Sequence, residues 1–539
     1  MAKTMKVLGE EPETLEEPRD TLGQSSSASI ARRLTAIARG VYQDDRQLQL
    51  ALLAFMILFY GALLGISWRL LLWGDPLNLT FNSMLAHLLR GQFDVDPQIL
   101  GFEGFARNGR VYAYWGIWCA LLRLPLWVFH RMDVDVTMWS CLVAVCLAGM
   151  AKVRAVLLLR RHGAQNPTAS LAVAMMLAYI LLGGSEVGYL RVTIYQEVVF
   201  WAAAFGAVFV YLAVKGIVRR CFDERTLCWM ALCAGLALLT RASTGVGLLL
   251  AFALLLIVLA VQAGIKAAPG APGPAIMQFG RALVQRRTLI PLAIAAVLIA
   301  ITGIVNYFRW GSPTTFADFT LYICNKCVGD PGPILRQYGT FNIRRIPFGL
   351  VYYFFPVWVL RGSGGQYLLQ GVQFRLFRMI ELPPSTFFLT DLLPIGFIVV
   401  LAIALWRRRP RFLPLAGQSA GAIAIGLLAP IVLMLAASSA AYRYRMEFYP
   451  EIDFLALLGL YLILTNQALL ATFARHRKWV MVALAVSIAG SFALLLIYDV
   501  GATSPTIRNM PAGIVEFYRQ AFSYDFHRLL GHHFAARHI

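Results

Sequence analysis

The feature that most constrains this chain is a series of long apolar blocks, each of about 16 to 26 residues. A block of that length can cross the hydrocarbon core of a bilayer as an α-helix, which needs about 20 predominantly apolar residues. The composition agrees, because 59% of the 539 residues are hydrophobic and only 14% are charged. Soluble globular domains carry about 25% charged residues. The sequence therefore predicts an all-α integral membrane protein and excludes an ordinary soluble enzyme.

The apolar blocks predict about eleven spanning helices. They lie near residues 48–73, 134–159, 168–184, 197–214, 227–241, 243–262, 288–305, 389–406, 413–437, 449–467 and 479–498. Basic clusters fall at one set of helix ends: Arg32–Arg33, Arg160–Arg161, Lys215 with Arg219–Arg220, Arg281 with Arg286–Arg287, Arg407–Arg409 and Arg475–Lys478. The positive-inside rule assigns those ends to the cytoplasm, which predicts a multi-pass protein of the cell (inner) membrane. These clusters also account for the net charge of +20 without a nucleic acid partner.

The chain is expected to have three parts. Residues 1–47 form a cytoplasmic disordered tail with a basic lead-in, 48–498 form the membrane domain, and 499–539 form an external tail with an amphipathic helix. Two long external loops, about 74–133 and about 306–388, interrupt the membrane domain. In the first loop, residues 76–90 predict an amphipathic interfacial helix that Asp75 can cap, with Pro76 at its first position and Gly91 at its end. Residues 116–131, interrupted by Pro125, predict a second interfacial or re-entrant helix.

Ionisable residues are expected to avoid the span interiors, since Lys152, Glu451 and Asp453 are placed near helix ends. Ion-coupled transporters usually need such groups at mid-membrane, so this pattern counts against a pump or antiporter. Six separated segments instead bring charged residues to the external side: Asp75, Asp94, Asp96, Glu103, Arg107 and Arg110; Glu186, Arg191 and Glu197; Arg241; Arg309; Arg344–Arg345; and Arg443, Arg445 and Glu447. A site there fits a substrate with a lipid tail and an anionic head.

Four stretches carry a family resemblance. They are the first external loop, with Leu88-Leu-Arg-Gly-Gln-Phe-Asp94-Val-Asp96 and Glu103-Gly-Phe-Ala-Arg-Asn-Gly-Arg110-Val-Tyr112-Ala-Tyr114; Tyr195-Gln-Glu197 with Gly235-Leu-Ala-Leu-Leu-Thr240-Arg241-Ala-Ser243; Asn306-Tyr-Phe-Arg309-Trp-Gly311-Ser312-Pro313; and Tyr442-Arg443-Tyr444-Arg445-Met-Glu447-Phe-Tyr-Pro450. In order, over about residues 48–465, they resemble the GT-C superfamily of integral membrane glycosyltransferases. The chain is most similar to bacterial members that are like dolichyl-phosphate-mannose mannosyltransferases. Many members have an adjacent acidic pair just after the first span, where this chain has only Asp75 before a proline.

The resemblance implies a GT-C-like bundle with external interfacial helices. It also implies transfer of a hexosyl or pentosyl group from a polyprenyl phosphate, with inversion, to a glycan, lipid or protein acceptor on the external, periplasmic face. The departing phosphate has a second pKa near 6, so it leaves without a proton from the enzyme. The remaining needs are one carboxylate that deprotonates the acceptor hydroxyl and arginines that bind phosphate oxygens. No cofactor is expected, and no metal is required if the donor is a monophosphate.

The expected general base is Glu103, Asp94 or Asp96, with the first two favoured. Arg443 is the first choice for the phosphate, helped by Arg241 and Arg344. The remaining candidates for substrate contact are Arg110, Tyr195, Glu197 and Tyr444.

Each of these residues also has a structural alternative. Loop carboxylates are usually solvated, Arg443 could be an interfacial anchor, and Arg241 could cap a helix C-terminus. Tyr195 and Glu197 could form a structural hydrogen bond to the first loop.

Two other functions stay open. A non-enzymatic lipid-glycan flippase or transporter would also need external arginines. A ligase or polymerase of the O-antigen type would use a lipid diphosphate donor. Cys324 and Cys327 lie in an external loop and are either a local disulfide or two free thiols; they predict no metal site because no second pair exists.

Overall fold

The computed structural model describes residues 45–71, 76–163, 165–266, 284–326, 332–355, 376–380, 386–408 and 416–503. The chain divides into two compact units, Met1–Leu52 and Leu53–Ile539. Apart from residues 45–52, where the first described helix begins, the features below belong to the second. The expected N-terminal tail before residue 45, the C-terminal helix near 514–530, Asp75 and Cys327 lie outside the described residues.

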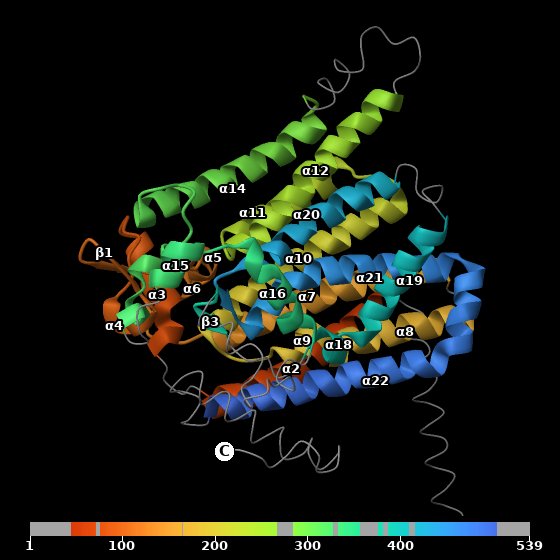
Figure 1. Cartoon of the computed structure of the whole chain (residues 1–539), viewed down its shortest axis with the longest axis horizontal. Helices are drawn as coiled ribbons and strands as arrows, with labels where there is room; N and C mark the ends of the chain where they lie inside the picture. The colour runs from red at the N-terminus through yellow and green to blue at the C-terminus, as the bar shows by residue number, and fades with distance from the viewer. Residues whose placement is uncertain are drawn as a thin grey trace, which may run out of the picture. The chain divides into compact units, whose positions relative to one another are not determined.

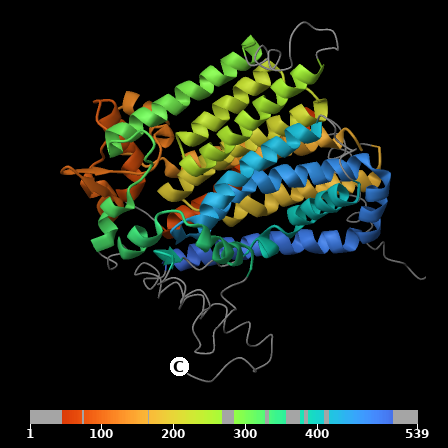
Figure 2. The same ribbon diagram turned by 45° about the horizontal axis from the view of Figure 1, so that its top comes forward.

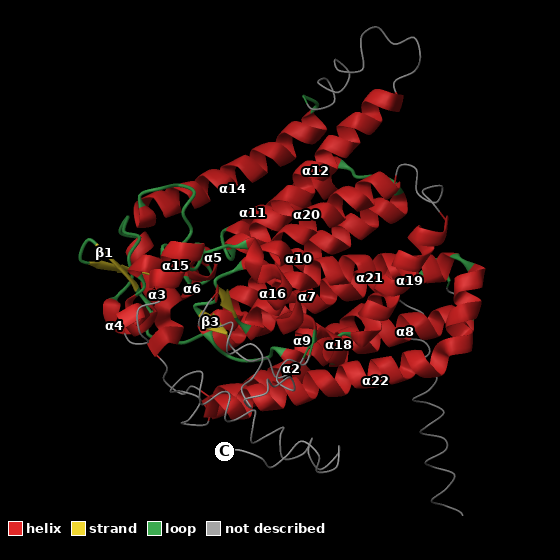
Figure 3. Ribbon diagram, viewed as in Figure 1, coloured by secondary structure: helices red, strands yellow, loops and turns green. Residues whose placement is uncertain are grey.

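Nine helices in the described part of the chain are long and apolar enough to cross a membrane. They are α2 (Asp45–Leu71), α7 (Thr137–Arg160), α8 (Pro167–Leu182) continued by α9 (Gly184–Gly188), α10 (Ile194–Arg219), α12 (Ala242–Lys266), α14 (Arg286–Trp310), α20 (Ala416–Ala436), η8 (Tyr442–Phe448) continued by α21 (Tyr449–Thr465), and α22 (Gln467–Thr503). Figure 3 shows how far helices dominate the described fold. The strands form two small sheets: an antiparallel hairpin of β1 (Phe105–Arg107) and β2 (Arg110–Tyr112), and a parallel pair of β3 (Met379–Ile380) and β4 (Ser439–Ala440). The expected all-helical membrane class is confirmed.

Two of the expected spans are helices that are not among these nine. The helix near 227–241 is α11 (Glu224–Leu238), with 15 residues, or about 22 Å at 1.5 Å per residue. The helix near 389–406 is α19 (Leu392–Arg408), with 17 residues. In contrast, α22 begins at Gln467 and so contains the basic segment Arg475–Lys478, which was expected to lie in a loop. Those four basic side chains are exposed, so the helix carries them without burying charge.

The long helices of the second unit pack in pairs, α10 on α7, α12 on α20, α11 on α14 and α19 on α21. Figures 1 and 2 both show α12 beside α20 and α11 beside α14. Gly426 of α20 allows one of these contacts, because a Cβ at that position would lie 2.2 Å from Ala251 Cα in α12. Small residues at such crossings are typical of helices that pack in membranes.

The first external loop folds into a small layer at one end of this bundle. Its elements are η1 (Pro76–Leu79), α3 (Thr80–Leu88), α4 (Pro97–Leu100), η2 (Gly101–Glu103), the β1–β2 hairpin, α5 (Trp118–Leu121) and α6 (Leu124–Val128). Figure 1 shows α3, α4 and β1 together at this end, next to the end of α14. The helix expected at 76–90 is thus present, but it does not lie flat with a solvated polar face. Its polar residues Asn82 and Ser83 are buried together with Phe81 and Met84.

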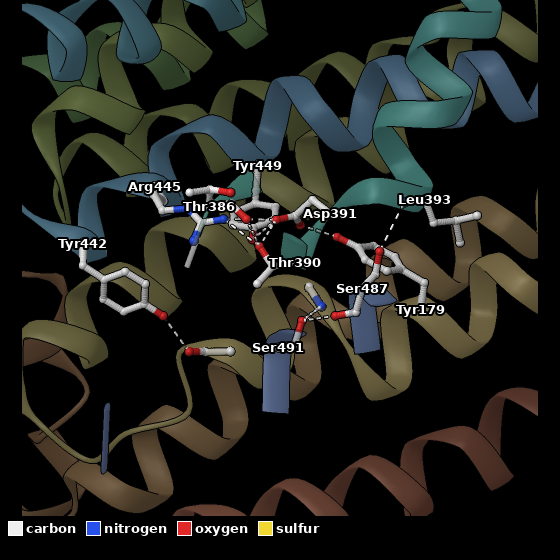
Figure 4. Close-up of polar contacts among 12 residues, drawn as sticks. Tyr179, Thr386, Thr390, Asp391, Leu393, Tyr442, Arg445, Tyr449, Ser487 and Ser491 are labelled. Carbon is white, nitrogen blue, oxygen red and sulfur yellow. Dashed lines mark hydrogen bonds and ion pairs between the residues drawn. The ribbon is translucent and has the colours of Figure 1, made fainter. Parts of the chain in front are cut away.

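The remaining short elements connect the long helices. They are α9 (Gly184–Gly188), η3 (Phe319–Leu321), η4 (Ile323–Lys326), α15 (Gly332–Tyr338), η5 (Ile343–Arg345), α16 (Ile346–Phe354), α18 (Phe387–Thr390) and η8 (Tyr442–Phe448). A buried polar cluster fixes η8, since Arg445 donates to Thr390 Oγ1 at 2.7 Å and pairs with Asp391 at 3.3 Å. Tyr179 and Tyr449 donate to the same carboxylate at 2.5 and 3.2 Å (Figure 4).

The expectation that span interiors lack ionisable groups is wrong. Lys152 lies eight residues before the end of α7 and forms buried ion pairs with Glu186 and Asp453. Asp453 falls near the middle of the apolar segment Tyr442–Thr465. The sequence places these three residues far apart along the chain, so the pairing that makes their burial tolerable could not be read from any one span.

Candidate active site

A cavity of about 200 Å³ opens where the first loop meets the ends of α11, α12, α14 and η8. Its lining includes Tyr114, Arg241, Arg309 and Tyr444. The cavity thus joins residues from four of the segments that were expected to meet on the external side.

The first loop is held against the end of α11 by backbone contacts. The amides of Gly116 and Trp118 donate to the carbonyls of Thr240 and Leu239 at 3.2 and 3.0 Å. Only glycine fits at position 116, because a Cβ there would lie 1.9 Å from the Leu239 carbonyl oxygen. This close approach places Tyr114 and Trp115 beside Arg241.

Arg309 is the least compensated charge at the cavity. Its side chain is buried, with 2% of the residue exposed. The guanidinium donates to the Trp115 carbonyl at 2.7 Å and contacts Met84 Sδ at 3.4 Å, while Nε has no hydrogen-bond partner. No carboxylate among the described residues forms an ion pair with it. A buried charge without a counterion is costly, which makes this position suited to an anionic ligand.

Arg241 is already paired. Its guanidinium donates to Glu447 Oε1, and Glu447 also accepts from Ser243 at 2.7 Å and from Thr244 at 2.6 Å. Three donors therefore hold the Glu447 carboxylate, which suits it to fixing Arg241 rather than to accepting a proton. The Arg241 guanidinium lies 5.2 Å from the centre of the Tyr444 ring.

Arg443 lies between two aromatic rings, 4.4 Å from the centre of Tyr195 and 5.6 Å from that of Tyr444. Such cation–π contacts orient the guanidinium. Arg443 and Arg241 therefore both contact the ring of Tyr444.

Tyr114 interacts electrostatically with Glu103, Arg241 and Arg443. Burial raises the pKa of the Tyr114 hydroxyl to about 12, with further upward contributions from Tyr444 and Glu103 and opposing ones from Arg443 and Arg241. Glu103 and both arginines therefore act on one side chain of the cavity wall.

Glu103 is held by Tyr322, whose hydroxyl donates to Oε2 at 2.7 Å. Burial and the adjacent Glu103 carboxylate raise the pKa of Tyr322 well above its ordinary value. Tyr322 therefore stays a donor at neutral pH and orients the carboxylate, so that Oε1 can accept a proton from a substrate.

Asp94 and Asp96 belong to a different cluster, and neither lines the cavity. His87 bridges them, with Nδ1 3.0 Å from Asp94 and Nε2 3.3 Å from Asp96, and Arg110 lies 3.8 Å from Asp94. The Ser83 hydroxyl donates to Asp96 at 2.6 Å. This hydrogen bond lowers the pKa of Asp96, against a smaller rise from burial. Glu103 does not line the cavity either, but it acts on the lining residue Tyr114. Of the three expected bases, the geometry therefore favours Glu103.

Glu197 does not face the cavity. It forms a fully buried two-pronged ion pair with Arg123 of the first loop, with N–O distances of 2.5 and 2.8 Å. Both oxygens of the Glu197 carboxylate are occupied by Arg123, so Glu197 is not a substrate-binding residue. The ion pair corresponds to the structural alternative given for Glu197, a contact with the first loop. Arg344 is exposed on η5 and does not line the cavity, although Thr340 and Phe341 of the same loop do.

A second, apolar cavity of about 610 Å³ lies along α12 and α14. It shares Leu238, Thr302 and Phe316 with the polar cavity. The two cavities are therefore neighbours, one able to hold a hydrocarbon chain and the other an anionic head.

Sequence reasoning left Arg309 and Tyr322 out of the site. The sequence placed Arg309 in the Asn306–Pro313 stretch and among the external charged residues. It did not show that Arg309 would be buried without a carboxylate partner. Tyr322 lies about 220 residues after Glu103, so only the folded chain pairs them.

No protein-family model matches this chain, and no curated protein is similar to it in sequence. Among solved structures, the chain is similar to the archaeal oligosaccharyltransferase AglB from Archaeoglobus fulgidus, in complex with an inhibitory peptide and a dolichol phosphate. The identity is 14%, the match covers 88% of this chain and 59% of that one, and the TM-score is 0.42. It is also similar to ArnT from Cupriavidus metallidurans bound to undecaprenyl phosphate, at 14% identity and a TM-score of 0.39, over 88% of this chain and 85% of that one.

The chain spans less than two thirds of the oligosaccharyltransferase, and TM-scores of 0.42 and 0.39 are too low to transfer an activity. We base the function below on the geometry of this chain.

Proposed function

We propose that this chain is a membrane glycosyltransferase that takes a hexosyl or pentosyl group from a polyprenyl phosphate. The observation that carries the proposal is the buried Arg309 in a polar cavity that adjoins an apolar one. An amphiphile fits both cavities, because its long hydrocarbon tail suits the apolar cavity and its phosphate head suits the cavity that contains Arg309. Its phosphate would offset the uncompensated guanidinium.

The proposed reaction uses one carboxylate. Glu103 accepts the proton of the acceptor hydroxyl, whose oxygen forms a bond to the anomeric carbon of the sugar. The bond from that carbon to the phosphate oxygen breaks, and the phosphate leaves with the electron pair and without a proton from the enzyme. Attack opposite to the leaving phosphate inverts the anomeric centre. General-base catalysis of this kind contributes roughly 10²- to 10⁴-fold.

Arginines bind the leaving phosphate in this proposal. Arg309 supplies the uncompensated charge, and Arg443 and Arg241, which both contact the ring of Tyr444, supply two further guanidinium groups. Guanidinium groups suit this role because they bind phosphate oxygens in pairs and stay charged when poorly hydrated. The acceptor is a glycan, lipid or protein on the external face, as the charge pattern of the loops predicts.

The second candidate is a lipid-glycan transporter, which the buried charges of Lys152, Glu186 and Asp453 favour. The two functions differ in what becomes of the donor, because a transferase cleaves the sugar–phosphate bond and a transporter does not.

The test is transfer of labelled sugar by the purified protein in lipid vesicles, from a panel of polyprenyl-phosphate sugars. The transferase predicts release of free polyprenyl phosphate together with labelled acceptor. Movement of intact donor across the vesicle membrane, without release of polyprenyl phosphate, would replace the proposal with the transporter. Transfer that requires a diphosphate donor would favour the ligase or polymerase.

A further inference from the structure

Three buried ionisable groups meet between α7, α9 and α21, and none of them lines either cavity. The Lys152 ammonium lies 2.7 Å from Glu186 Oε1 and 2.8 Å from Asp453 Oδ2. The three side chains are 7%, 2% and 4% exposed. Lys152 also donates to the Ser185 hydroxyl at 2.8 Å, which in turn donates to Glu186 Oε2 at 2.9 Å. We call these three ionisable residues the buried triad.

The buried triad contains one cation and two carboxyl groups. With both carboxyls ionised it would hold a net negative charge inside an apolar helical bundle, where unpaired charge is expensive.

Within the described residues, Lys152 is the cation that pairs with Glu186 and Asp453. Asp391, a further carboxylate that acts on Asp453, is itself paired with Arg445. The phenols near the triad and Asp391 include Tyr60 of α2, Tyr179 of α8, Tyr449 of α21 and Tyr189, which follows α9. The Tyr60 hydroxyl donates to the carbonyls of Ile180 and Leu181. Figure 4 shows Tyr179 and Tyr449 directed at Asp391 beside Arg445. These phenols can donate hydrogen bonds but carry no positive charge.

We propose that Glu186 and Asp453 bind one proton between them at neutral pH, so that the triad is a neutral proton-binding site. The site is connected to η8, since the Lys152 ammonium lies 5.4 Å from the centre of the Tyr449 ring and Tyr449 donates to Asp391, the partner of Arg445. The bound proton is therefore part of the support of the segment that carries Arg443 and Tyr444. This inference does not depend on the proposed transfer reaction.

The test is infrared spectroscopy of the purified full-length protein at pH 7, because a protonated carboxyl group absorbs apart from a carboxylate. The variants are Asp453→Asn and Glu186→Gln. Each leaves one carboxylate opposite Lys152, which removes the need for the proton. We expect each variant to lose the absorption of one protonated carboxyl relative to the unmodified protein. Because two independent variants report the same loss, failure of one to fold does not remove the test.

Glu451→Gln is the matched control. Glu451 is also buried in α21, two residues from Asp453, and is 4% exposed with an unbonded carboxylate oxygen. Glu451→Gln removes any protonated-carboxyl absorption that comes from Glu451 itself, while the absorption of the triad should remain. The proposal is overturned if the unmodified protein and Asp453→Asn give the same protonated-carboxyl absorption. It is equally overturned if Glu451→Gln abolishes that absorption completely.

Discussion

Replacing Arg309 by glutamine tests whether the cavity binds an anion. Arg309 is buried and forms no ion pair within the described residues, so its charge raises the free energy of the empty protein. Arg309→Gln removes that charge while keeping a side chain that can donate to the Trp115 carbonyl. We therefore expect the empty variant to be at least as stable as the unmodified protein, but to bind polyprenyl phosphate less tightly.

The size of the loss follows from the contact that is removed. A hydrogen bond to an ionised group contributes about 1.5–3 kcal/mol, and each 1.4 kcal/mol changes Kd about tenfold. The variant should bind polyprenyl phosphate about 10- to 100-fold more weakly. At a lipid concentration 100 times the Kd of the unmodified protein, ligand stabilisation should fall from about 2.7 kcal/mol to between about 1.4 and 0.4 kcal/mol.

The assay is thermal unfolding of the purified protein, with and without polyprenyl phosphate, and with neutral polyprenol as the uncharged ligand. Arg131→Gln is the control, because Arg131 lies in the first external loop, is exposed and pairs loosely with Asp133 at 3.7 Å. Polyprenyl phosphate should stabilise the unmodified protein and Arg131→Gln equally. An equal stabilisation of Arg309→Gln would show that the phosphate does not bind there. A large drop in the stability of the empty variant would contradict the claim that the charge is uncompensated.

Three further predictions concern the carboxylates. Glu103→Gln should reduce sugar transfer by roughly 10²- to 10⁴-fold without weakening donor binding, as measured by single-turnover transfer and by ligand stabilisation. Arg123→Met should lower the free energy of unfolding by about 3–5 kcal/mol because it leaves the buried Glu197 unpaired, and addition of Glu197→Gln should restore much of it in denaturant unfolding. The Ser83 hydrogen bond lowers the pKa of Asp96, so its contribution to stability is present above the unfolded pKa of about 4 and is lost as the pH falls through the lower folded value. Asp96→Asn should therefore unfold at a lower temperature than the unmodified protein at pH 7, and the two should converge in acid.

Each of these has a contrary outcome. Asp133→Asn, which changes an exposed carboxylate of the same loop, is the control for Glu103→Gln, and full transfer by Glu103→Gln would remove Glu103 from the role of base. Additive losses in the Arg123 and Glu197 pair would show that the two side chains do not interact. An Asp96→Asn curve parallel to that of the unmodified protein at every pH would show that the Ser83 contact does not shift the titration.

The spanning helices could be predicted because their signal is local. A run of apolar residues forms a helix in a bilayer regardless of its neighbours, since every backbone polar group must be satisfied within the segment. The predicted centres of the long spans hold for this reason. Helix ends were less predictable, as α22 shows by continuing through the exposed Arg475–Lys478 segment.

Part of the candidate site was also predictable. Arginines and acids at the same ends of several helices had to lie near one another once the spans alternated, and Arg241, Arg443 and Glu103 all act on Tyr114. The close backbone contact at Gly116 was harder to predict, because a glycine beside aromatic residues does not by itself reveal that another backbone lies against it.

The sequence by itself determined that this chain is helical, membrane-embedded and charged at its helix ends, because each of these properties depends on a single segment. The tertiary structure decided which charges are paired. Glu197 meets Arg123, Glu186 and Asp453 share Lys152, Glu103 meets Tyr322, and Arg309 is left with no carboxylate among the described residues. The physical reason is that the energy of a buried charge depends on partners within a few ångströms, and packing brings those partners together from distant parts of the chain.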